Sequence, residues 1–312
     1  MFLKENIFVN LFFQFLKERF MKRRIAESEL VLNPDGSVYH LNLKPENISD
    51  TIIFVGDQKR VDRIAKHFDT IEFETQKREF HTITGTYKGK RLTAMSTGIG
   101  PDNIDIVMNE LDALVNIDLK TREIKDELTS LNIVRIGTSG SLQADIPVDS
   151  FVLGKYGLGM DGLLHFYDSK SVRELDMEDA FIKHTGWSPD KARPYIVKNS
   201  RKLENLLLTD KVYSGITGTA VGFFGPQGRV LRIPLADPDM NKKMDSFEYN
   251  GVRMSNLEME TSAIYGLSKL LGHHACSMNA IIANRANMTF SKDPYKPIEA
   301  LIQYTLDKLA EL

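Results

Sequence analysis

Short runs of apolar residues that end in glycine alternate along the chain with segments of helical periodicity. Residues 51–55 form one such run before Gly56, and residues 132–136 form another before Gly137. Runs of this length predict buried strands, whereas apolar side chains at every third or fourth position predict helices over residues 60–68 and 103–115. Residues 81–87 and 91–96 flank a Lys-Gly-Lys turn and predict a hairpin.

The second half of the chain continues the same alternation. Strands or extended segments are predicted at residues 148–153, 212–221 and 277–283, and helices at residues 176–183, 201–208, 258–271 and 297–312. Strands that alternate with helices indicate a mostly parallel central sheet with helices on both faces. We therefore expect an α/β fold with a mixed to mostly parallel sheet, and one domain over residues 31–312.

Residues 1–30 depart from this pattern and predict an N-terminal helical extension. Six of the 17 Phe lie before position 21, and residues 7–16 contain only Asn10 and Gln14 as polar residues. This run is shorter than the roughly 20 residues of a membrane span, and no small-residue cleavage site follows it. Three interpretations stay open: an amphipathic helix packed on the body or a partner subunit, a natural start at Met21, or a helix on a membrane surface.

The composition excludes several classes of protein. Lys plus Arg number 40 and Asp plus Glu number 42, a formal net charge of −2, which excludes a generally basic surface for nucleic acid. The single cysteine, Cys276, excludes an internal disulfide and cysteine-based zinc sites. It fits a reducing compartment, so we expect a cytoplasmic protein with no nucleic-acid or membrane partner.

Three polar segments lie at predicted strand ends, where open α/β sheets bind their ligands. In the first, residues 56–60, Gly56 would let the backbone approach an anion and Arg60 would add a positive charge. The alternative is a plain turn with an exposed arginine, and this segment taken alone favours that alternative. The sequence matches neither the Walker A nor the G-x-G-x-x-G pattern, so a nucleotide-phosphate loop of those kinds is not supported.

The second segment, residues 135–140, reads Arg-Ile-Gly-Thr-Ser-Gly. Arg135 lies inside an apolar strand, where a charge is costly unless it is paired. An arginine followed by two hydroxyl residues and two glycines suits a phosphate. The alternative is an arginine that pairs with a nearby carboxylate.

The third segment, residues 256–260, opens the predicted helix at residue 258 and contains Glu258 and Glu260. On a helix, side chains two residues apart point in different directions, so both carboxylates could not bind one metal ion. A single carboxylate could accept two sugar hydroxyls. The alternative is a pair of helix-start acids favoured by the helix dipole.

These segments belong to a series of blocks by which the chain resembles the uridine phosphorylases of the nucleoside phosphorylase-I family, from about Ser37 to the C-terminus. In order, the matching blocks cover residues 38–41, 56–60, 78–80 with 84–87 and 96–100, 135–140, 161–166, 223–229, 256–260 and 284–285. Two positions depart from the family pattern. Gln58 replaces the proline of its phosphate turn, and Gly225-Pro226 alters its base-reading loop.

The resemblance implies a role for each matching residue. The implied phosphate-binding residues are Gly56, Arg60, Arg135 and Thr138, with Arg78 from a neighbouring subunit. The implied ribose-binding residues are Met259 and Glu260, with His40 from the neighbour. The implied base-binding residues are Phe223, Gln227 and Arg229. Arg229, Gln227 and Arg285 would stabilise the departing base. The resemblance implies neither a metal nor a cofactor, and inorganic phosphate would be a co-substrate.

The implied reaction is phosphorolysis of uridine to uracil and ribose 1-phosphate, in pyrimidine nucleoside salvage, by a homo-oligomer that is at least a dimer. Purine-specific relatives carry an aspartate after their late strand that can protonate the base. Residues 283–287 read Ala-Asn-Arg-Ala-Asn here, which favours a pyrimidine. The alternatives are a broad-specificity or purine nucleoside phosphorylase, a nucleosidase that uses water, and a non-enzymatic nucleoside-binding protein.

Overall fold

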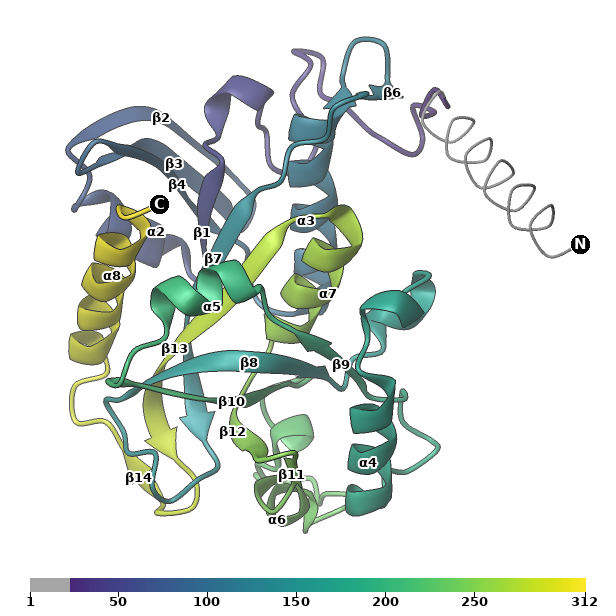
Figure 1. The fold of residues 1–312 in the computed structure, drawn as a ribbon, viewed down its shortest axis with the longest axis vertical. Coiled ribbons are helices and arrows are strands. Elements are labelled where there is room, and N and C mark those ends of the chain that lie inside the picture. Colours follow the sequence, from purple (N-terminus) through teal and green to yellow (C-terminus); the bar gives the residue numbers. More distant parts are fainter. Residues whose placement is uncertain (1–22) are drawn as a thin grey trace, which may run out of the picture.

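The computed structural model describes residues 23–312, and Figure 1 shows one α/β body in which helices lie on both sides of a central sheet. The interpretations of residues 1–22 lie outside the described residues. In the described part of the chain, no helix combines the length and the apolar character that a membrane crossing requires.

The central sheet contains twelve strands among the described residues. Ten of them form one path in the order β11 (Glu248–Tyr249), β12 (Val252–Glu258), β10 (Val212–Thr219), β8 (Phe151–Gly159), β13 (His274–Asn284), β7 (Asn132–Ser141), β1 (Thr51–Val55), β4 (Lys90–Ser96), β3 (Phe80–Tyr87) and β2 (Thr70–Lys77). β9 (Tyr195–Lys198) pairs with β8, and β14 (Thr289–Phe290) pairs with β13. β5 (Ile117–Asp118) and β6 (Glu123–Ile124) form a separate hairpin.

The pairing is mixed, as the sequence predicts. β4, β1, β7 and β13 run parallel to one another, and so do β8, β10 and β12. β13 and β8 join the two parallel groups in antiparallel fashion. β12 also pairs with β7, so β12, β10, β8, β13 and β7 close into a ring. This closing pair brings residues 256–257 beside residues 140–141.

Helices cover both faces of the sheet. The described α-helices are α2 (Gln58–Ala65), α3 (Pro101–Asn116), α4 (Leu175–Thr185), α5 (Arg201–Leu207), α6 (Met240–Asp245), α7 (Thr261–Leu271) and α8 (Tyr295–Leu309), with 3₁₀ turns at Pro45–Asn47, Leu163–Phe166, Lys170–Val172 and Gly225–Gln227. Ile52 and Phe54 of β1 pack in the core with α3 and α7, whereas Ile53 and Val55 pack with α2, α5 and α8. Burial on both faces explains why this strand is continuously apolar.

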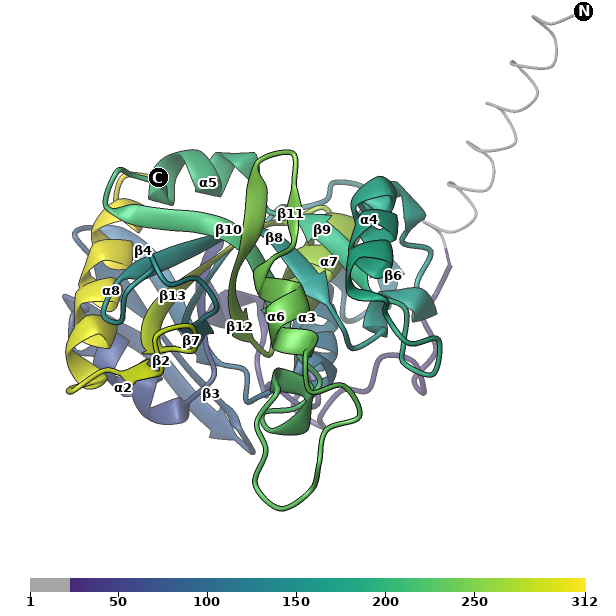
Figure 2. The same cartoon turned by 90° about the horizontal axis from the view of Figure 1, so that it is seen from below.

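Several predicted boundaries were wrong: the strand predicted at residues 148–153 is β8 at Phe151–Gly159, and two further errors concern the polar segments. β7 does not stop at Gly137 but continues to Ser141, so residues 135–140 form part of a strand. The helix predicted from residue 258 begins at Thr261, and residues 256–258 end β12. Sequence patterns missed β2, β9 and β12, because β2 is largely exposed, β9 has only four residues and β12 has mixed polarity. The connection between β10 and α6 projects from the body in Figure 2.

Candidate active site

A cavity of about 290 Å³ lies where several strands of the sheet end. Its walls come from the ends of β1, β7, β12 and β13 and from the connection after β10. The lining residues are Gly56, Asp57, Arg60, Ile99, Arg135, Thr138, Ser139, Gly140, Phe223, Gln227, Arg229, Leu257, Glu258, Met259, Glu260, Ile282, Ala283 and Phe290. All three polar segments singled out in the sequence therefore meet at one site.

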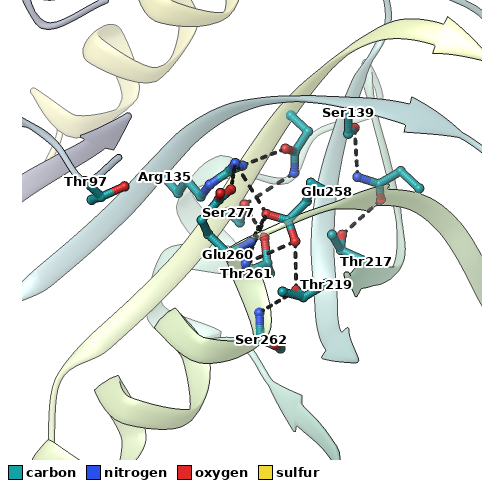
Figure 3. Close-up of polar contacts among 12 residues, drawn as sticks. Thr97, Arg135, Ser139, Thr217, Thr219, Glu258, Glu260, Thr261, Ser262 and Ser277 are labelled. Carbon is teal, nitrogen blue, oxygen red and sulfur yellow. Dashed lines mark hydrogen bonds and ion pairs between the residues drawn. The ribbon is translucent and has the colours of Figure 1, made fainter. Parts of the chain in front are cut away.

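Arg135 is buried in the wall of this cavity, and Figure 3 shows it among converging polar side chains. Its Nη1 donates to Asn279 Oδ1 at 2.9 Å, and its Nη2 pairs with the Glu260 carboxylate and lies 3.4 Å from Glu258 Oε2. Burial acts to lower the pKa of Arg135, but the charges of Glu260 and Glu258 outweigh it and raise that pKa. The guanidinium is therefore held as a fixed cation.

Both carboxylates reach Arg135, which corrects the prediction that Glu258 and Glu260 point apart. The reason is that Glu258 ends a strand, where side chains two residues apart share a face. Glu258 also accepts hydrogen bonds from Thr219 Oγ1 at 2.8 Å and from the N–H of Thr261 at 3.0 Å. These contacts commit Glu258 to holding the strand end and the helix start together.

Glu260 has fewer internal partners. Its Oε1 accepts the N–H of Gly100 at 2.9 Å, and its Oε2 pairs with Arg135. A carboxylate has about four acceptor positions, so Glu260 keeps capacity for hydroxyl groups that enter the cavity. Met259, the neighbouring residue, also lines the cavity.

Gly137 is required by the position of the Arg135 side chain. The two residues share a face of β7, and a Cβ at Gly137 would lie 1.7 Å from Arg135 Nη1 and 2.6 Å from Asn279 Oδ1. The Arg135 side chain can therefore lie along this face of β7 only because residue 137 has no side chain. The sequence reading attributed this glycine to a strand end, although the Arg-x-Gly spacing on a strand is the signal for this packing.

Arg60 marks the opposite end of the same cavity from Gln227. Its Nη1 donates to the carbonyl of Ile136 at 3.2 Å, and within residues 23–312 it forms no ion pair. Burial, followed by the positive charge of Arg135, lowers the pKa of Arg60 to about 10. Gly56 and Thr138 line the cavity beside it. The buried Arg135 and the half-buried Arg60, which has Asp57 nearby but forms no ion pair with it, leave this end suited to an anion.

At the other end, two arginines converge on one buried amide. Gln227 Oε1 accepts hydrogen bonds from Arg229 Nη1 at 2.8 Å and from Arg285 Nη2 at 3.1 Å. The Arg229 guanidinium lies 3.8 Å from the centre of the Phe223 ring. Burial, followed by the charge of Arg229, lowers the pKa of Arg285 to about 10. Arg285 does not line the cavity but supports Gln227 from behind.

His40 and Arg78 do not line the cavity of their own chain. His40 Nδ1 lies 2.6 Å from Glu110 Oε1, and the same carboxylate accepts the N–H groups of His40 and Leu41. Arg78 is exposed in the turn between β2 and β3 with a φ of 55°, and its carbonyl accepts Gln58 Nε2 at 2.6 Å. Gln58, which departs from the family pattern, thus ties this turn to the start of α2.

Sequence reasoning missed Asn279, Thr219 and the structural role of Glu258. Asn279 was detectable in principle, because it is a polar residue between the apolar Met278 and Ala280 of a buried strand. Thr219 had no signal, since its contact with Glu258 joins two strands that are neighbours only in the folded sheet.

Comparisons with known proteins agree with this geometry. Residues 50–301 match the family described as the phosphorylase superfamily. The chain is 26% identical to a uridine phosphorylase of Thermococcus kodakarensis over 93% of each chain. It is 35% identical to a DeoD-type purine nucleoside phosphorylase of Listeria welshimeri over 77% of this chain and 84% of that one. A Trypanosoma brucei nucleoside phosphorylase that shows uridine phosphorylase activity superposes with a TM-score of 0.82 at 29% identity, covering 91% of this chain and all of that one.

Proposed function

The chain belongs to the phosphorylase superfamily as a nucleoside phosphorylase, and we propose that its substrate is uridine, which it splits with inorganic phosphate to uracil and ribose 1-phosphate. The observation that carries the choice of base is the pair of arginines at Gln227. The carboxylates that line the cavity are Asp57, Glu258 and Glu260, and none lies in the group of Phe223, Gln227 and Arg229. This end of the cavity therefore stabilises a base that leaves as an anion.

The proposed phosphate site comprises Gly56, Arg60, Arg135 and Thr138. Phosphate attacks the anomeric carbon while the bond to the base breaks, so the sugar becomes positive and the base negative. The phosphate dianion stabilises the sugar, and Glu260 with Met259 holds the ribose so that the anomeric carbon faces the phosphate. Arg229, which lines the cavity, stabilises the charge that develops on the base. No side-chain acid is required for a leaving group of this kind.

Uracil binding would require one rearrangement at Gln227. Uracil presents an N3–H beside a carbonyl, which a glutamine amide can match with its own acceptor and donor. Both lone-pair directions of Gln227 Oε1 are occupied by arginine N–H groups. Arg229 therefore turns from Gln227 to a uracil oxygen when the base enters, while Arg285 keeps the amide in place. Phe223 then contacts the base with the ring surface that Arg229 vacates.

The proposal includes a second subunit. His40 and Arg78 lie outside the cavity of their own chain and are assigned to the ribose and phosphate of a partner's site, so the smallest active unit is a homodimer. Glu110 contacts the N–H groups of His40 and Leu41 and the Nδ1 of His40. These three contacts fix the conformation in which His40 would face the partner's site. The buried, free Cys276 fits the cytoplasm as the compartment of a salvage enzyme.

A purine nucleoside is the second candidate, because a relative at 35% identity is a purine nucleoside phosphorylase. The late strand argues against it. Residues 283–287, at the end of this strand, contain no carboxylate, and the amide of Asn284 donates to the carbonyls of Gln143 and Ile146 at 2.9 and 2.7 Å. Its Oδ1 accepts the N–H of Asn287 at 2.8 Å, so this side chain is fully used within the protein.

The decisive experiment measures base release from uridine, deoxyuridine, thymidine, cytidine and inosine, each with and without phosphate. We expect uracil from uridine only when phosphate is present. Cytidine presents a donor where uracil presents an acceptor, and an unpaired buried group costs roughly 1–3 kcal/mol, so it should react about tenfold to a hundredfold more slowly. Equal rates without phosphate would support a nucleosidase, and rapid cleavage of inosine would support the purine candidate. No turnover of any nucleoside would support a binding protein.

A further inference from the structure

A second cavity lies at the other end of β13, between β9, the start of α5 and the last turns of α7, and its volume is about 260 Å³. His274 and Ala275 line it, whereas Ile282 and Ala283 of the same strand line the proposed active site. Eight residues of strand separate these positions by about 25 Å. The second cavity is thus a separate place on the molecule, and Figure 1 shows the elements that surround it.

The charged residues that line this second cavity are all positive. The lining residues are Lys198, Asn199, Ser200, Arg201, Lys202, Tyr265, Ser268, Lys269, His273, His274 and Ala275, with no carboxylate among them. The three lysines and the arginine form no ion pair within residues 23–312. This concentration of positive charge stands on a chain whose formal net charge is −2. Cations that form no direct ion pair and line a concave surface favour an anionic ligand.

The wall of the cavity also contains polar atoms without partners. Six buried side-chain atoms in the described part of the chain lack a hydrogen bond, and Asn199 Oδ1, Ser268 Oγ and His273 Nε2 are three of them. His273 Nε2 has a nearby charge, because it lies 3.3 Å from Asp112 Oδ1. Asn199 and Ser268 have no such neighbour, although a buried polar group normally has a partner. These atoms are buried, so a ligand in the cavity would contact the lysines and not these atoms.

Lys269 is the cation most dependent on such a ligand. It is half-buried, and burial lowers its pKa, with Glu174 acting in the opposite direction and Lys198 in the same one. Lys202 differs, because its Nζ already donates to Asn132 Oδ1 at 2.8 Å. An anion between Lys198 and Lys269 would relieve both the repulsion between the lysines and the desolvation of Lys269.

We propose that this cavity binds the phosphoryl dianion of a small molecule, either inorganic phosphate or a sugar phosphate, at the cluster of Lys198, Lys202 and Lys269. The proposal is independent of the proposed function, because no residue of the active-site cavity takes part. It assigns the protein a second anion site through which a phosphorylated metabolite can bind without competing with the nucleoside.

The test follows the imidazole signals of His274 by NMR in the full-length protein, with the signals assigned by comparison with His274→Gln. Inorganic phosphate and ribose 5-phosphate are titrated in separate arms. We expect saturable shifts of the His274 signals, and a loss of affinity of about tenfold or more in Lys269→Met, which keeps the apolar stem but removes a charge-assisted bond. Tighter binding of ribose 5-phosphate would identify an ester as the occupant, and equal affinities would identify phosphate itself.

The matched control is Lys120→Met, which removes an exposed lysine from the turn between β5 and β6 and should leave both titrations unchanged. Thermal unfolding of all variants checks that the fold is intact, and Lys198→Met provides a second variant should Lys269→Met unfold. Unsaturable shifts, or the same affinity in wild type and both cavity variants, would overturn the proposal. Because His274 reports only on this cavity, the result does not depend on whether uridine is the substrate.

Discussion

Arg135 and Gly137 act as one unit, because the arginine side chain occupies the space that a Cβ at residue 137 would need. Gly137→Ala would force Arg135 away from Glu260 and Asn279, and overpacking of this kind costs about 1–3 kcal/mol. We expect a lower midpoint of urea unfolding and a raised KM for phosphate. The control for stability is Gly140→Ala in the same strand, whose methyl group would lie 3.3 Å from the Arg285 side chain and 3.8 Å from the Ala283 carbonyl. Equal stability of the two variants would contradict this account.

Replacing Arg229 should affect the rate of catalysis more than the binding of uridine. The charge that it meets develops on the base in the transition state, so Arg229→Ala should lower kcat more than it raises KM. Loss of one oriented donor of this kind typically costs about 10²- to 10³-fold in kcat. Steady-state kinetics with uridine measure both constants. Arg193→Ala, which removes an exposed arginine paired with Asp179, is the control and should change neither. An unchanged kcat in Arg229→Ala would remove Arg229 from the mechanism.

At the scale of elements, Asp307 ties helix α8 to the β3–β4 hairpin. Its carboxylate accepts hydrogen bonds from Lys88 Nζ and Tyr87 OH, each at 2.7 Å, and from Gln303 Nε2 at 3.1 Å. These contacts, the one with Lys88 first, lower the pKa of Asp307 to about 2. A carboxyl group with a lowered pKa in the folded state stabilises the protein above its unfolded pKa, and that stabilisation is lost as the pH falls toward 2.

The corresponding variant is Asp307→Asn. Because the carboxylate is partly exposed, with 43% of its side chain accessible, the expected loss of stability at pH 7 is at most about 1 kcal/mol. The difference from wild type should begin to shrink as the pH falls below about 4, because the Asp307 carboxyl of the unfolded chain is protonated first and that of the folded protein only near pH 2. Urea unfolding at pH 7, 5, 4 and 3.5 measures this difference. A difference that is the same at every pH would show that Asp307 acts by packing and not by charge.

At the scale of the whole molecule, the proposed active site takes residues from two chains. His40→Ala and Arg229→Ala should each be inactive or nearly so, but a mixture allowed to exchange subunits should recover activity. In a hybrid dimer one site receives both wild-type sets, so random exchange restores about a quarter of the sites. Uridine phosphorolysis after mixing, compared with each variant alone, measures the recovery. Full activity of a dilute monomer, or no recovery after proven exchange, would contradict the shared site.

The sequence predicted those elements well whose pattern comes from burial. Residues 51–55 were placed without error, because burial on both faces leaves a continuous apolar run. The helices α3 and α8 were found within a few residues of their ends, since a periodic apolar stripe faces the core. The pattern failed at β2, which is exposed along much of its length, and at residues 256–260, where a strand, a turn and a helix follow within five residues.

The sequence by itself determined the mixed α/β fold, the family and the residues that gather at the strand ends, because these follow from local patterns and from motifs in a set order. Only the tertiary structure decided how those residues contact one another. Arg135 meets Glu260 across 125 positions of chain and Asn279 across 144, through strands whose pairing no local pattern records. Lys269 likewise meets Lys198 and Lys202 beside His274 from a distant part of the chain. Such contacts depend on the closure of the sheet, which is a property of the whole chain.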